Sequence, residues 1–231
     1  MTGLLQRLIK QGGMYAVGNT VIKLSGLILA PFYLNPALLE QQAYGHLILL
    51  EVTSQVLIML GGFGLGSGLM KFMTDSRYRS VHGGLPFSAL LFSLGTALFT
   101  TVVLVLFSRS ISGFLLDDPG SSHIIAMLAV YIGFKILAGV PLAFIRIKER
   151  AGLYALAISL EMVLLITGIY YYLVVAGQGL EGVMMAYIIS SAVSTSILVG
   201  AMLRRTSAWH KPVLLKNLAL FGLPLVFAAL A

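Results

Sequence analysis

Six long apolar stretches dominate this chain, and each is long enough to cross a lipid bilayer as a helix. An α-helix needs roughly 20 residues to span ~30 Å of hydrocarbon. The stretches are 21 to 23 residues long, and they predict an all-α, polytopic membrane protein, because a helix satisfies its backbone polar groups within the segment. They run from Met14 to Leu34, Tyr44 to Leu65, Pro86 to Phe107, Ile124 to Ile145, Ala151 to Leu173 and Gly182 to Leu203.

The basic residues between these spans lie almost entirely on one side of the predicted bundle. Twelve of them fall before the first span, in the second and fourth connections and after the sixth span, whereas the opposite side holds only Arg109. Under the positive-inside rule, this asymmetry predicts a cytoplasmic amino terminus. The twelve are Arg7, Lys10, Lys71, Arg77, Arg79, Arg146, Lys148, Arg150, Arg204, Arg205, Lys211 and Lys216.

Composition excludes several classes of protein. With 58% hydrophobic and 10% charged residues, the chain is unlike a soluble domain, which carries about 25% charge. Its net charge of +7 is spread over short connections and forms no nucleic-acid-binding face. The absence of Cys excludes disulfides and thiolate chemistry, and the four histidines have no metal-ligand spacing. We therefore expect no metal, no cofactor, no nucleic-acid partner and no enzymatic activity.

A glycine-rich segment at residues 62–68 superficially resembles a phosphate-binding loop. It follows no predicted strand, and no Lys-Ser or Lys-Thr pair completes the motif. We interpret it as a helix end where repeated glycines allow a bend or a close helix contact.

A short pattern recurs at the two ends of the chain. Leu4, Leu5, Leu8 and Gly12 return at an offset of 210 residues, as Leu214, Leu215, Leu218 and Gly222. An even number of spans separates the copies, so both begin on the same side, as a parallel repeat requires. We expect residues 1–210 to form a six-helix amino-terminal lobe, and residues 211–231 to begin a seventh helix and a second lobe that is truncated here.

Four ionisable residues lie in the middle of predicted spans, where a charge costs roughly 2.5 to 3.5 kcal/mol. In the first span Lys23 shares a helix face with Asn19 and Gly26. This face either packs against a neighbouring helix while the lysine reaches the interface, or faces a hydrated cavity; we favour the cavity. In the second span Glu51 and Gln55 continue a polar stripe.

The other two ionisable residues, Lys135 and Glu161, lie at similar depths in the fourth and fifth spans. Measured from the membrane surface on the side without the twelve basic residues, these depths are roughly 17 and 18 Å at 1.5 Å per residue. The two side chains can therefore pair across a helical hairpin. Such a pair is either structural, with a desolvation cost that can cancel its attraction, or a pair that opens when substrate or a proton arrives.

Three segments of the chain resemble the polysaccharide and oligosaccharide-lipid flippases of the multidrug/oligosaccharidyl-lipid/polysaccharide superfamily. They are the opening LLQRLIKQGGMYAVGNTVIKLSGLILAPFYLNPALLEQQAYGHL, the GGFGLGSGLMKFM after the second span, and the closing LLKNLALFGLPLVFAALA. The resemblance is to the amino-terminal lobe. It implies a two-lobed, alternating-access transporter of the bacterial inner membrane, which turns over polyprenyl-pyrophosphate-linked sugars for O-antigen, capsule or exopolysaccharide synthesis.

The flippase hypothesis assigns candidate roles to the polar residues within the spans. Lys23 and Lys135 are expected to attract the anionic head group together with Asn19 and Gln55, and Glu51 or Glu161 is a candidate coupling residue. The partners would be the lipid-linked oligosaccharide, membrane lipid and the glycan polymerase machinery. Two alternatives stay open: a cation-coupled multidrug exporter of the same superfamily, and a non-transporting scaffold of a glycan-assembly complex.

Overall fold

The computed structural model describes residues 20, 24, 26–75, 84–206, 218, 220–222 and 224. Within these residues it contains helices and no strand, which confirms the all-α class. Five helices are long and apolar enough to cross a membrane, so the chain is a multi-pass membrane protein. Those five helices correspond to the second to sixth predicted spans. Of the first span, residues 26–33 are helical, and most of the rest lies outside the described residues.

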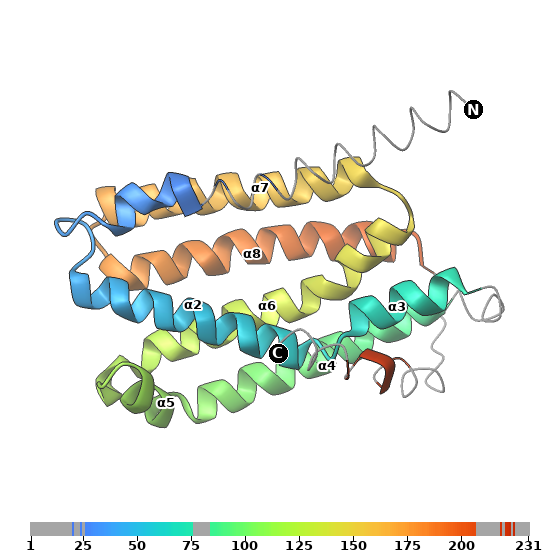
Figure 1. Ribbon diagram of the computed structural model, residues 1–231, viewed down its shortest axis with the longest axis horizontal. Helices are drawn as coiled ribbons and strands as arrows, with labels where there is room; N and C mark the ends of the chain where they lie inside the picture. The colour runs from blue at the N-terminus through green and yellow to red at the C-terminus, as the bar shows by residue number, and fades with distance from the viewer. Residues whose placement is uncertain are drawn as a thin grey trace.

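The spans form an antiparallel bundle (Figure 1). They are α2 (Gln41–Gly61), α4 (Leu85–Leu106), α6 (Ser122–Ile147), α7 (Ala151–Ile169) with its π-helical continuation η3 (Tyr170–Val175), and α8 (Gly179–Leu203). Three shorter helices complete the description: α3 (Leu65–Thr74), α5 (Ser108–Leu115) and the 3₁₀ turn η2 (Pro119–Ser121).

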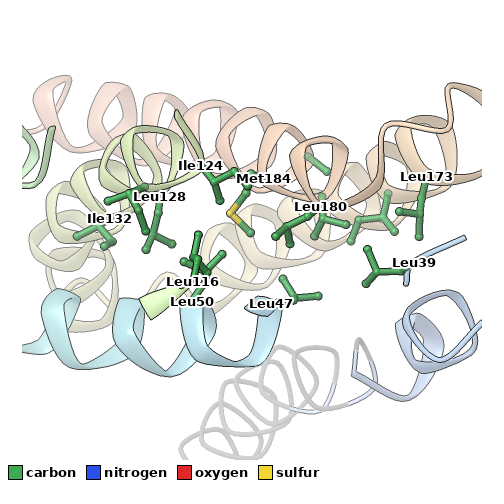
Figure 2. Packing of buried hydrophobic residues seen from close by; sticks show 14 of the residues in the cluster. Leu39, Leu47, Leu50, Leu116, Ile124, Leu128, Ile132, Leu173, Leu180 and Met184 are labelled. Atoms are coloured by element: carbon green, nitrogen blue, oxygen red, sulfur yellow. The ribbon is translucent and has the colours of Figure 1, made fainter. Parts of the chain in front are cut away.

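Helix α6 is the centre of the bundle and the most deeply buried of the spans. It contacts α2, α3, α4, α5, α7 and α8. A core of aliphatic side chains fills the space between α2, α6 and α8, with Leu50, Ile132 and Met184 almost completely buried (Figure 2). Lipid supplies no hydrophobic driving force between helices, so close packing and interhelical hydrogen bonds must hold such a bundle together. Ser93 Oγ supplies one of these bonds by donating to the Ile136 carbonyl at 3.0 Å.

The second predicted span is wrong at its end, because the helix stops at Gly61 and not at Leu65. Residues 62–64 form a turn in which Gly64 has a φ of 60°, and α3 begins directly after it. This left-handed backbone favours glycine, which has no Cβ to clash. Leu65 and Leu69 of α3 are then buried in a core cluster that includes Leu218. The glycine-rich segment is therefore a helix break with a close contact, as its composition indicates.

The two copies of the terminal repeat are only partly described. Leu218 and Gly222 of the second copy pack against α3 and the turn before it, where the Gly222 backbone leaves no room for a Cβ on Gly64. The first copy and Leu214 and Leu215 lie outside the described residues, so the two-lobe division stays a prediction.

Candidate functional site: two polar chambers at mid-depth

An ion pair joins α6 to α7 in the middle of the bundle. Lys135 Nζ donates a hydrogen bond to Glu161 Oε1, and the side chains keep 28% and 22% of their full exposure. Opposite charges in a low-dielectric setting attract strongly, which offsets part of the cost of placing them there. The structure therefore brings together the two residues that the sequence places at equal depth.

A second cation lies three helical turns further along α6. Arg146 Nη2 donates to the Tyr154 hydroxyl at 2.7 Å, and its guanidinium carbon lies 4.8 Å from the centroid of that ring. Eleven residues separate Arg146 from Lys135, which is close to three turns at 3.6 residues per turn, so both cations lie on one face of α6. Tyr154 is buried in the first turn of α7, and it holds the guanidinium at the end of the bundle where the connections are basic.

These two cations and Glu161 line a cavity of about 300 Å³, which we call the Lys135 chamber. Its other walls include Leu142, Ile158, Met162, Leu165, Tyr187 and Ser190. Among the described residues that line it, two are cationic and one is a carboxylate, so the chamber carries an excess of positive charge. An anion entering it would find one guanidinium that already faces a hydroxyl and one ammonium that can exchange its carboxylate partner.

A second cavity, of about 490 Å³, lies nearer the opposite end of the bundle and is called the Glu51 chamber. The Tyr187 hydroxyl of α8 donates to Glu51 Oε1 of α2. The hydroxyl oxygen of Tyr33 lies 3.4 Å from that of Tyr187 and extends this polar contact to the helical residues 26–33. The lining of the Glu51 chamber also includes Gly26, Ala30, Tyr44, Ser54 and Gln55.

Two stacked tyrosines separate the chambers. The rings of Tyr131 and Tyr187 lie 5.3 Å apart between centroids with an interplanar angle of 24°. Both tyrosines and Leu165 line both cavities, so they form the wall between them. Lys135 Nζ lies 5.9 Å from the Tyr131 centroid, within reach of a cation–π contact. A continuous series of contacts therefore runs from the Glu51 carboxylate through the two rings to the Lys135–Glu161 pair.

The structure divides the residues predicted for the site between these chambers. Lys135 and Glu161 line one, and Glu51 and Gln55 line the other. Lys23 and Asn19 lie outside the described residues. Gly26 and Ala30, from the same predicted face of the first span as Lys23, line the Glu51 chamber.

Sequence reasoning missed Arg146 and Tyr187 as members of the site. Arg146 counts as a connection residue by its position, and only its spacing from Lys135 indicates a shared face. Tyr187 is separated from its partner Glu51 by 136 residues, so no local pattern joins them.

Comparisons with solved structures show the fold to which these chambers belong. Over 97% of this chain, it is similar to an outward-facing multidrug resistance transporter of the MATE family in the MOP superfamily, with a TM-score of 0.76 and 17% identity. It is similar over the same share to a MOP superfamily transporter from Pyrococcus furiosus, described as having a binding pocket of reverse polarity, with a TM-score of 0.78 and 17% identity. A MATE protein in complex with Br-NRF gives a TM-score of 0.80, again at 17% identity.

The chain spans about half the length of these transporters, between 52% and 54%. No protein-family model matches it, and no curated protein matches its sequence. At this level of identity the likeness shows the fold alone, and one fold can serve different substrates.

Proposed function

We propose that the protein is a transporter lobe that turns lipid-linked oligosaccharide over in the bacterial inner membrane, with its amino terminus in the cytoplasm. The observation that carries this proposal is the Lys135 chamber, which holds two cations and one carboxylate. The fold of MOP superfamily transporters supports transport in general, and the charge of this chamber supports an anionic head group.

The chamber explains how a pyrophosphate can enter a membrane protein without a prohibitive cost. A lone charge in the bilayer has a high free-energy cost, and the Lys135 ammonium lowers this cost by pairing with the Glu161 carboxylate. An arriving pyrophosphate gives the Lys135 ammonium a second anionic partner, and the Arg146 guanidinium can bind its oxygens in a bidentate manner. These charge-assisted hydrogen bonds replace the water that the pyrophosphate loses on entry. The polyprenyl chain can meanwhile stay in lipid, and no covalent bond changes.

The position of the chambers fits alternating access. Arg146 lies near the basic end of α6, which is cytoplasmic if the amino terminus is, and the Glu51 chamber lies toward the other side. The stacked Tyr131 and Tyr187 rings stand between them. Rocking of this lobe against a second lobe would expose one chamber and then the other. Glu51 and Glu161 are the candidate residues for coupling this motion to a cation or a proton.

The experiment exchanges the two charges of the ion pair. Lys135→Glu combined with Glu161→Lys keeps a salt bridge in the chamber while it moves the cation from α6 to α7. A second variant, Lys135→Gln with Glu161→Gln, removes both charges and leaves no charge unpaired. Lys148→Ala is the matched control, because it removes an exposed lysine from the end of the same helix, outside the chamber.

The measurements are protein abundance in the membrane and surface polysaccharide, in cells whose chromosomal copy is replaced by each variant. We expect normal abundance for all three variants, loss of polysaccharide for both chamber variants, and normal polysaccharide for Lys148→Ala. Normal polysaccharide in both chamber variants would contradict a role for the Lys135 cation in transport, and would leave the pair a structural contact of the kind a scaffold protein needs.

The Glu51 chamber favours one second candidate, a cation-coupled multidrug exporter. A carboxylate beside Tyr33, Tyr44, Tyr131 and Tyr187 presents negative charge and aromatic faces, which together suit an organic cation. Drug tolerance on expression that Glu51→Gln abolishes, with unchanged surface polysaccharide, would select this function over the flippase.

A further inference from the structure

A short helix at the end of the bundle opposite the basic connections has an exposed aromatic side. Helix α5 follows α4 after a single residue, Phe107, and runs across the bundle axis (Figure 1). Its buried side is anchored by Ser112, which has no exposed surface, and by Ile111 and Leu115, which pack against the main core. The helix is therefore held firmly against the bundle by one side only.

The two faces of α5 that lie on either side of its buried face, which we call its flanks, differ in chemistry. Phe107 and Phe114 are seven residues apart, which brings them to the same flank, and they keep 58% and 86% of their exposure. Arg109 is exposed and lies about 200° from Phe107 at 3.6 residues per turn, which places it on the other flank. The helix thus presents phenyl rings on one flank and a guanidinium on the opposite one.

The phenyl flank continues the apolar surface of a membrane span. Helix α4 exposes Phe99, Val102 and Leu106, and the exposed Phe107 follows directly. A membrane-spanning helix turns such a surface toward acyl chains. The end of a span reaches the membrane–water interface, where the apolar faces of interfacial helices carry Trp, Phe and Leu.

We propose that α5 is an interfacial helix that binds phospholipid of the leaflet at this end of the bundle. Phe107 and Phe114 insert among the upper acyl chains, and Arg109 on the water side binds a lipid phosphate. Amphipathic helices with an aromatic and a basic face lie in the interface in this way. The guanidinium suits the partner, because its fork of donors matches phosphate oxygens. The contact fixes the depth of the α4–α6 connection and does not depend on the transported substrate.

The test places a single tryptophan on the phenyl flank. Phe114→Trp is made together with Trp209→Phe, so that the whole protein, reconstituted in phosphatidylcholine vesicles, has one tryptophan. Gln178→Trp in the same background is the control, because Gln178 is exposed in the connection between η3 and α8 at the same end of the bundle. Quenchers are phospholipid brominated near the head group, which acts from the bilayer, and acrylamide, which acts from water.

We expect several-fold stronger quenching of the tryptophan at position 114 than of the control by brominated lipid, and the reverse order with acrylamide. Equal acrylamide quenching at both positions would overturn the proposal by placing the phenyl flank in water. Protection of position 114 from both quenchers would also overturn it, since protein would then cover this flank. Adding Arg109→Gln should weaken the lipid quenching at position 114 while circular dichroism shows unchanged helix content, and unaltered quenching would refute the phosphate contact.

Discussion

Removing one partner of the Lys135–Glu161 pair should destabilise the bundle far more than removing both. Lys135→Met leaves the Glu161 carboxylate without its cation inside the chamber. Leaving one charge of a fully buried pair alone costs about 3–5 kcal/mol, and because these side chains keep roughly a quarter of their exposure, we expect about 2–3 kcal/mol.

An independent limit supports this magnitude. An orphaned carboxylate can avoid desolvation by taking up a proton. For an ordinary glutamate with a pKa of about 4.3, that costs about 3.7 kcal/mol at neutral pH, at 1.36 kcal/mol for each pH unit. The penalty of Lys135→Met should therefore stay below this limit. The double variant Lys135→Met with Glu161→Leu replaces the pair by apolar groups of similar size, which is often neutral or stabilising.

The assay is a double-mutant cycle of unfolding free energies for the purified protein in mild detergent. We expect each single variant to lose about 2–3 kcal/mol and the double variant to lose less than either single one, so that the coupling energy is at least ~2 kcal/mol. Single losses that add up in the double variant would refute the argument, because additivity means that the two charges do not interact.

Three further perturbations test other contacts. Tyr187→Phe removes the hydroxyl that donates to Glu51, and unfolding in detergent should show a loss of about 1.5–2 kcal/mol, at the lower end for hydrogen bonds to charged groups. Gly64→Ala should cost about 1–2 kcal/mol from its left-handed backbone alone, measured in the same way, and more because a Cβ there meets backbone atoms. The Ser121 hydroxyl and then the Gly120 amide hold the pKa of Asp118 below its ordinary value, so its carboxyl resonance should titrate at unusually low pH, and Ser121→Ala should raise that pKa. Because the folded pKa is lowered, the contribution of Asp118 to stability is present above the unfolded pKa and is lost as the pH falls through the folded pKa.

Each of these perturbations has a control in the same chain. Tyr33→Phe should cost less than Tyr187→Phe, because its hydroxyl contact of 3.4 Å is long for a hydrogen bond between hydroxyls. Gly95→Ala lies in a helix with open space around the new methyl group, so it should be neutral or stabilising. Equal losses for both tyrosine variants, or for both glycine variants, would count against the contacts invoked. If Ser121→Ala leaves the pKa of Asp118 unchanged, the hydrogen bond from Ser121 is not what lowers that pKa.

The spans could be predicted because the thickness of the hydrocarbon sets their length. The sequence boundaries of the fourth span, Ile124 and Ile145, lie two residues inside those of α6. The equal depth of Lys135 and Glu161 anticipated their contact, because two helices joined by a short connection run side by side and place equal depths next to each other.

Elements that depend on distant packing could not be read from the sequence. Helix α3 continues past the predicted end of the second span, and its buried Leu65 and Leu69 pack in a cluster with Leu218, which lies far along the chain. Helix α5 lies between the third and fourth predicted spans, and its polar Ser112 is buried only because of its position in the fold. The Tyr187–Glu51 contact likewise requires the fold to bring α8 beside α2.

Thiol labelling of neighbouring positions on α7 distinguishes a hydrated Lys135 chamber from one that is dry and packed. Met162 lines the chamber, whereas Val163, the next residue, is exposed on the outside of the bundle and does not line it. The chain has no native Cys, so Met162→Cys and Val163→Cys each introduce a single thiol. In membrane vesicles, a charged, water-soluble thiol reagent should label position 162 and leave position 163 in lipid unlabelled, and pyrophosphate should slow the labelling at 162. No labelling at position 162, or equal labelling at both positions, would contradict a water-filled chamber.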